Sequence, residues 1–425
     1  MILDILLSLF GTIFVIESVN KILKNKSNSI GNYIMIVIYV FNCFPIILNL
    51  ILGLPNYKLL PYFSPFYVAS QNQYIRNIYS FYILLVMIMI RLYLYKIRYK
   101  HNIKILYTKS RSRILRGKML LGISLAPIIY VLIIGHYKEY MIFQSSIRRG
   151  LSNSEYSILI LLEYIGLFSF ICWFFEYNKQ KKMHSYFYIL LYFFLIIWID
   201  GKRFLIPTVI VLFLFFYTHS VYFIYKKIPL KLVISILIIL FGLLYSGYTL
   251  LYKINTINSL RIIDSLYLAF RIDFGRDDVT KFVLYKEIIE KQPILNYRGE
   301  SLIATFLFFI PRSLWINKPF PHYRYLTAAL YNTQILDIPA GMTPSIFEMS
   351  IANFGVILGI IFTLIFLIFC IKISDNEKSI VLKAMYLIMI IGILTQSMDA
   401  MIAMIFLSVF NKLFQKLKFM GKSII

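Results

Sequence analysis

The chain has 425 residues, of which 60% are hydrophobic, and a mean hydropathy of +0.76. Soluble globular domains do not carry so much apolar surface, so the composition excludes that class and indicates an all-α, polytopic membrane protein. The formal charge is +25 at pH 7. Most of this charge lies in short loops between apolar segments, which is typical of the positive-inside rule and argues against binding of nucleic acid.

Apolar segments long enough to cross a bilayer as helices recur from end to end, and we predict about eleven spans. An N-terminal bundle of about eight spans covers 1–251, a large and mostly helical loop covers 252–352, and further spans with a basic tail cover 353–425. The predicted spans are 2–20, 30–54, 78–95, 119–136, 157–175, 186–200, 204–224, 230–251, 353–372, 380–396 and 399–412.

The basic residues of alternate loops predict the orientation in the membrane. The run Lys96–Lys118 holds nine Lys and Arg residues, and the C-terminal tail is also basic. These segments are expected in the cytoplasm. The N-terminus and the large loop would then lie outside, with the protein in the plasma or inner membrane.

Several kinds of site are absent from the sequence. The three cysteines, Cys43, Cys172 and Cys370, lie in apolar runs and are predicted to be buried small hydrophobes. The chain has no CxxC pair, P-loop, HExxH motif or GxSxG elbow. We therefore expect neither a bound metal nor a cofactor.

The large loop carries its own helical patterns. Apolar residues at helical spacing predict one helix over 258–272, and a second begins at Asp277 and Asp278 and ends before Pro293. The segment 301–316 is apolar but too short to span, so we expect a re-entrant or interfacial segment. This loop is predicted to fold back onto the membrane and to roof a cavity.

Cations at this membrane face are candidates for binding a diphosphate. Lys202 and Arg203 end a predicted span, where they either snorkel to headgroups or contact phosphate oxygens. Arg312 lies between Pro311 and Trp315, and an unpaired charge in such apolar surroundings is costly. The loop cations are Arg271, Arg276, Arg298, Arg312, Lys318 and Arg324, each of which could instead form local ion pairs.

Glu348 is the preferred candidate for a general base, because it precedes an apolar span and burial would raise its pKa. Asp277 is a second candidate, with a helix cap or salt bridge as the alternative. His322 is a third. Arg91 and Glu163 fall within predicted spans, where charged residues are functional candidates by default.

Four groups of residues together resemble the Wzy-type oligosaccharide repeat-unit polymerases of O-antigen and capsule pathways. They are Gly201–Lys–Arg203, Gly299–Glu–Ser301, the run Phe309–Ile–Pro–Arg–Ser–Leu–Trp–Ile–Asn–Lys–Pro319, and Thr343–Pro–Ser345 with Glu348 and Asn353–Phe–Gly355. The resemblance covers roughly 195–365, whereas the N-terminal third matches only in hydropathy. The paired Arg-x10-Gly loop motifs of some members are absent.

The resemblance implies a metal-independent glycosyltransferase of GT-C-like architecture. Such an enzyme transfers a growing glycan from undecaprenyl diphosphate to a second lipid-linked repeat unit, and its expected partners are a chain-length regulator and a flippase. Glu348 and Arg312 would be catalytic. The residues expected to bind substrate are Arg203, Arg276, Lys318, Arg271 and Lys202.

Three alternatives remain open at this point. A glycan ligase would have the same architecture but would transfer finished polymer. A transporter or flippase of lipid-linked sugars usually has internal repeats and short external loops, which are not evident here. A structural membrane scaffold would leave the cations of the large loop unexplained.

Overall fold

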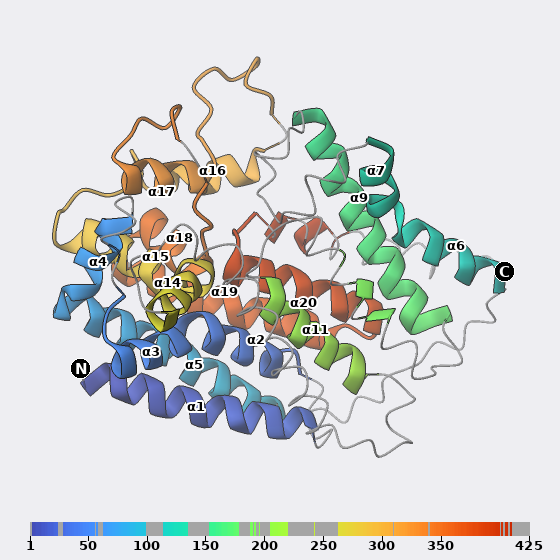
Figure 1. The fold of residues 1–425 in the computed structure, drawn as a ribbon, viewed down its shortest axis with the longest axis horizontal. Helices are drawn as coiled ribbons and strands as arrows, with labels where there is room; N and C mark the ends of the chain where they lie inside the picture. Colours follow the sequence, from blue (N-terminus) through green and yellow to red (C-terminus); the bar gives the residue numbers. More distant parts are fainter. Residues whose placement is uncertain are drawn as a thin grey trace.

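The computed structural model contains only helices and turns in the part of the chain that it describes (Figure 1). This confirms the all-α prediction. The described residues are 2–23, 29–55, 57, 63–98, 114–134, 153–177, 188–189, 191–192, 195, 205–219, 242, 262–308, 310–338, 341–399, 401–402, 404–406 and 409.

Four of the described helices are long and apolar enough to cross a membrane. They are α1 (Ile2–Leu23), the continuous α2 (Gly31–Ile38), η1 (Tyr39–Cys43) and α3 (Phe44–Leu52), then α5 (Gln73–Arg98) and α19 (Val356–Asn376). A fifth is the pair Gly117–Ser124 and Ala126–Ile134, bent by 43°, which belongs to α6 (Ile114–Ser124) and α7 (Ala126–Ile134). The protein is therefore membrane-embedded.

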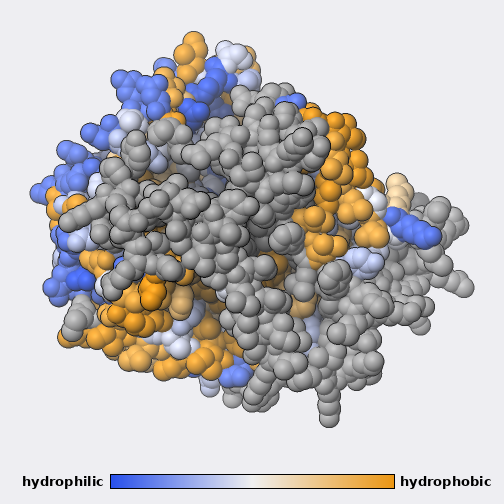
Figure 2. Space-filling view, in the orientation of Figure 1, coloured by the Kyte–Doolittle hydropathy of each residue, from blue (hydrophilic) through white to orange (hydrophobic). Residues whose placement is uncertain are grey.

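Three further predicted spans coincide with helices whose apolar stretches are shorter: Leu161–Phe175 within α9 (Asn153–Cys172) and η5 (Trp173–Tyr177), Val209–Thr218 within α11 (Leu205–Thr218), and α20 (Ile380–Thr395). The predicted spans 186–200 and 230–251 lie mostly outside the described residues, and half of 399–412 does. Bulky apolar side chains such as Ile357 and Ile365 are 75% and 64% exposed on α19, as expected of a lipid-facing helix. Figure 2 shows hydrophobic residues at the lower left of the view, where α1 and α3 lie in Figure 1, and at the upper right, where α7 and α9 lie.

Five described helices fall within the segment that was predicted to be one external loop: α14 (Ile262–Phe274), α15 (Arg276–Ile288), α16 (Glu300–Phe306), α17 (His322–Tyr331) and α18 (Ile346–Phe354). They gather at one end of the bundle with α4 (Ser64–Gln71) (Figure 1). We call this end of the bundle the loop end. Helix α3 ends there, and α5 and α19 begin there. The segment is helical as predicted, but α14, α15 and α18 pack within the bundle.

Helix α14 runs inward along α3. The Tyr267 hydroxyl donates to the Gly53 carbonyl (2.9 Å) at the loop end, and the rings of Phe274 and Phe41 meet deeper down, with centroids 5.9 Å apart. At 1.5 Å per residue, Phe41 lies about 16 Å along the helix from the end of α3. The hairpin of α14 and α15 therefore reaches well into the bundle.

Gly275 makes the reversal between α14 and α15. A Cβ at this position would lie 2.5 Å from the Arg271 carbonyl oxygen, so a larger residue would distort the turn at the end of α14. Helix α15 then runs back outward: its residues from Arg276 to Leu284 are buried, and Ile289 beyond its end is 42% exposed.

Helix α18 forms a second hairpin, with α19. Gly355 joins the two helices with φ of 79°, a value that favours glycine. A Cβ on Gly359 would lie 2.6 Å from the Ser350 carbonyl oxygen, so the two helices are in direct backbone contact. Helix α18 therefore begins inside the bundle and ends at the loop end.

Candidate functional site

Four buried charges meet near the reversal of α14 and α15. Arg271 Nη2 lies 2.8 Å from Asp277 Oδ2 and also contacts Asp278, while Lys281 Nζ lies 2.7 Å from the same Asp277 oxygen. The side chains are at most 2% exposed. Two cations therefore balance two carboxylates inside the bundle, and charges at such depth are rare unless they serve a function.

Two hydroxyl groups, one from α4 and one from the segment before it, also bind this cluster of charges. The Tyr57 hydroxyl donates to Asp278 Oδ2, and Ser70 Oγ donates to Asp278 Oδ1 (3.2 Å). Within the described part of the chain, Arg271 Nε and Nη1 and Asp277 Oδ1 still have no hydrogen-bond partner. Such groups are costly when buried, which points to a ligand or a further polar group at this place.

The two adjacent carboxyls have opposite pKa shifts. Burial alone would raise the pKa of Asp277, but the charges of Arg271 and Lys281 lower it below its usual range. Burial and the neighbouring charge of Asp277 raise the pKa of Asp278. Asp277 is thus a salt-bridged carboxylate, which was the alternative to its role as a base.

Glu348 lies in the first turn of α18 and is fully buried. It forms the capping box of this helix, because the backbone N–H and the hydroxyl of Ser345 both donate to its carboxylate. Thr280 Oγ1 on α15 lies 3.5 Å from Glu348 Oε2. Burial raises the pKa of Glu348 to about 7, while Ser345 and Arg276 act in the opposite direction.

Arg276 opens α15 and is 4% exposed. Its Nε donates to the Thr395 carbonyl at the end of α20 (3.0 Å), and its guanidinium lies 5.9 Å from the centre of the Phe41 ring. Burial lowers the pKa of Arg276 to about 10, and the charge of Glu348 opposes this shift. Arg276 therefore stays a cation at neutral pH.

The first turns of α15 and α18 thus meet inside the bundle, and both helices run outward from this point. Helix N-termini carry a partial positive charge and attract anions, an arrangement that transporters use at the middle of the membrane. The π-helical turn η1, a feature often found at functional sites, packs against α15. We call the combined set the polar centre; it comprises Arg271, Arg276, Asp277, Asp278, Lys281 and Glu348.

A second polar layer lies closer to the loop end and joins α16, α17 and α18. Asn353 Nδ2 donates to Ser301 Oγ (2.7 Å), and His322 Nδ1 lies 3.1 Å from the same oxygen. Burial lowers the pKa of His322 to about 3, so the ring is neutral at physiological pH. His322 therefore lies in the contact that holds these helices together and outside the polar centre.

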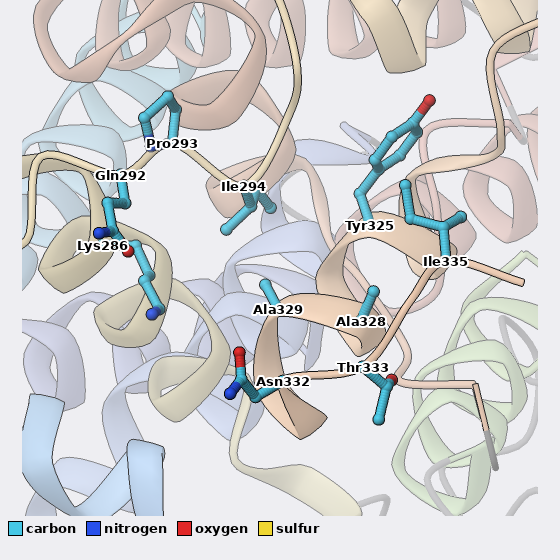
Figure 3. Close-up of a pocket in the computed structure, with 10 residues that line it drawn as sticks. All are labelled: Lys286, Gln292, Pro293, Ile294, Tyr325, Ala328, Ala329, Asn332, Thr333 and Ile335. Atoms are coloured by element: carbon cyan, nitrogen blue, oxygen red, sulfur yellow. The ribbon is translucent and has the colours of Figure 1, made fainter. Parts of the chain in front are cut away.

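A groove of about 230 Å³ lies where α15 and α17 end (Figure 3). It presents amides from Gln292 and Asn332 and a small apolar floor from Ala328 and Ala329. Lys286 at its rim is paired with Glu290 (2.5 Å), so the groove carries little net charge. Its full lining is Lys286, Gln292, Pro293, Ile294, Tyr325, Ala328, Ala329, Asn332, Thr333 and Ile335.

The structure separates the residues that the sequence had grouped. Arg276 lies near enough to Glu348 for their charges to interact, and Arg271 pairs with Asp277 and Asp278, whereas Lys202 and Arg203 lie outside the described residues. Arg312 is exposed and donates to the carbonyls of Lys318 (2.7 Å) and Pro319 (3.1 Å). Its environment is thus not the apolar one that was predicted, because its own loop supplies polar partners.

Lys318 also binds its own loop, with Nζ donating to the carbonyls of Phe308 (2.9 Å) and Ile310 (2.7 Å). Arg91, a candidate within a span, pairs with Glu17 and lies 4.7 Å from the Phe14 ring centre. The sequence analysis missed Lys281, although its position four residues after Asp277 is the signal for such a pair. It also missed Tyr57, for which no local pattern exists.

Within the described residues, no group of three or more His, Cys, Asp or Glu side chains is arranged to hold a metal ion. Comparison with known proteins gives no relative: no family model matches the chain, and neither a curated protein nor a solved structure is significantly similar to it.

Proposed function

We propose that the protein is a polymerase that joins lipid-diphosphate-linked oligosaccharide repeat units at the outer face of the plasma or inner membrane. One observation carries the proposal: the first turns of α15 and α18 meet inside a membrane-embedded bundle, where the charge of Arg276 acts on Glu348, and Arg271 of α14 pairs with the carboxylates of α15. Helix N-termini and guanidinium groups stabilise a diphosphate anion without requiring a metal.

In this proposal a hydroxyl of the acceptor sugar attacks the anomeric carbon of the donor. The bond between that carbon and the diphosphate oxygen breaks, and undecaprenyl diphosphate leaves with the electron pair. Glu348 accepts the hydroxyl proton, and a carboxyl with a pKa of about 7 suits this role. Arg276 and Arg271 stabilise the charge that develops on the leaving group. Arg312 and Lys318 lie outside this centre because their donors bind their own loop.

The groove between α15 and α17 suits the glycan part of the substrate. Amides, a threonine hydroxyl and a small apolar floor are groups that contact neutral sugars. Helix α15 connects the two regions, since its first turn belongs to the polar centre and its last turn to the groove. The lipid tails of the substrate would occupy the bilayer beside the bundle.

The proposal includes the finer membrane architecture expected from the sequence. The protein would have about eleven spans in a GT-C-like arrangement, with its N-terminus outside and its C-terminus in the cytoplasm. The O-antigen or capsular polysaccharide pathway of the cell would supply the flipped repeat units, and a chain-length regulator would act with the enzyme.

The test compares surface glycan length in a strain that lacks this protein with that in a strain that carries it. The proposal expects a ladder that collapses to a single-repeat band without the protein and returns on complementation. A ladder that persists on the lipid carrier would instead indicate a ligase. Loss of all surface glycan, single repeats included, would indicate a transporter.

A further inference from the structure

The loop after α16 carries an apolar tip, which we define as Phe308, Leu314, Trp315 and Ile316; three of these side chains are exposed and Trp315 is half-buried. Leu314 is 80% exposed, Ile316 85% and Phe308 56%. Side chains of this size are rarely so exposed together in water, and a clustered apolar surface usually marks a contact with a membrane or another protein. In Figure 2 hydrophobic side chains project at the top of the view, where this loop rises above α16 in Figure 1.

Two cations close the base of this loop and give it a fixed shape. Arg312 donates to the carbonyls of Lys318 and Pro319 and lies 3.9 Å from the centre of the Phe320 ring. Lys318 donates in turn to the carbonyls of Phe308 and Ile310. The tip is therefore presented by a hydrogen-bonded loop that also holds both positive charges.

The loop leaves the protein at the level where the lipid-facing surface begins. The backbone N–H of Leu302 on α16 donates to Asn353 Oδ1 (3.3 Å) near the end of α18. Only a few residues later α19 starts, and its Ile357 and Leu358 are 75% and 62% exposed. The apolar tip and the lipid-facing side of α19 thus start from the same end of the bundle.

We propose that the apolar tip inserts into the membrane interface at the loop end, as a lipid anchor for α16 and α17. Leu314, Trp315 and Ile316 would lie among the upper acyl chains, while Arg312 and Lys318 would lie at the depth of the lipid phosphates. Trp is favoured at this depth, and basic residues behind an apolar surface are typical of interfacial segments.

The experiment uses Trp315 as the probe, since the chain has only three tryptophans. The full-length protein with Trp173→Phe and Trp198→Phe is reconstituted in phosphatidylcholine vesicles containing anionic phosphatidylglycerol. Trp315 emission is then measured with lipids brominated near the carbonyl end of their acyl chains, with lipids brominated near the methyl end, and with aqueous iodide.

The proposal expects at least twofold quenching by the shallow bromines, weaker quenching by the deep ones and little by iodide. Leu314→Ser with Ile316→Ser should at least halve the shallow quenching; both positions are exposed, so the fold should be retained. Strong quenching by iodide without quenching by bromolipid would overturn the proposal. If Trp315 is protected from bromolipid and from iodide only at a high protein-to-lipid ratio, the tip contacts a second copy of the chain. That result would also overturn the proposal.

Discussion

Replacing Glu348 by Gln separates the proposed chemistry of this residue from its structural role. Glu348 caps α18 through Ser345, and a Gln side chain keeps a carbonyl oxygen that can accept from the Ser345 backbone N–H. The substitution therefore preserves the cap but removes the group that accepts the proton. Loss of a general base typically lowers a rate by about 10²–10⁴-fold.

The pH dependence gives the expected magnitude for the wild-type protein. Because the pKa of Glu348 is raised to about 7, its ionised fraction grows about tenfold between roughly pH 6 and pH 8. The transfer rate of the wild type should rise by a similar factor over that range, and the residual rate of Glu348→Gln should not. The assay follows glycan transfer by purified protein in liposomes at saturating substrate.

The same carboxyl predicts a change in stability. Raising a pKa from 4.5 to about 7 corresponds to about 3 kcal/mol, and because the folded state holds the proton more tightly, the contribution of this carboxyl to stability is greatest below pH 4.5 and declines until about pH 7. Thermal unfolding in detergent should show this decline in the wild type and less of it in Glu348→Gln. A Glu348→Gln enzyme within threefold of the wild-type rate, with an unchanged pH profile, would refute the role of Glu348 as the base.

Four further substitutions test the geometry. Arg271→Met leaves Asp277 and Asp278 with one cation and should cost about 3–5 kcal/mol of stability by denaturant unfolding; adding Asp278→Asn restores the balance and should recover much of that loss. Gly359→Ala places a Cβ 2.6 Å from the Ser350 carbonyl and should lower the melting temperature by several degrees, whereas Gly122→Ala, with nothing within 4 Å, should not. Asn332→Gly removes a groove amide at a left-handed position (φ 52°) that glycine tolerates, and should raise KM for the acceptor about tenfold at unchanged stability; an unchanged KM would exclude the groove from acceptor binding. Arg312→Ala removes two contacts within its own loop and should leave chain growth within about threefold of wild type; complete loss of polymer would return Arg312 to the catalytic centre.

The membrane helices could be predicted from the sequence because their signal is local. Twenty or so apolar residues in a row cross a bilayer whatever surrounds them. Helices α1, α5 and α19 lie within a few residues of the predicted spans. The helical patterns of 258–272 and of the segment after Asp277 were also local, and α14 and α15 confirm them.

The depth of α14 and α15 could not be predicted, because it depends on distant pairings. Tyr267 with Gly53 and Phe274 with Phe41 bring together residues more than two hundred positions apart. Asp277 and Lys281 lower the mean hydropathy of their segment, which was therefore assigned to the external loop. Inside the bundle their charges cancel, and hydropathy does not register such pairing.

For Arg312 the prediction was wrong in the opposite direction, because it placed an exposed residue in apolar surroundings. Its apolar neighbours in sequence, Pro311 and Trp315, suggested a buried charge, yet the turn places its guanidinium against backbone carbonyls at the surface. A loop supplies polar partners from its own main chain, and the one-letter sequence does not show them. Glu348, in contrast, was identified correctly as buried because an apolar helix follows it directly.

The central claim is that this protein itself joins lipid-linked repeat units. The most direct measurement adds purified undecaprenyl-diphosphate-linked repeat units to the purified protein in liposomes, with no nucleotide sugar present. The account predicts glycans of two or more repeats and one undecaprenyl diphosphate released for each bond formed, and neither product with Glu348→Gln. Full-length protein that stays folded and leaves every repeat unit unjoined would contradict it.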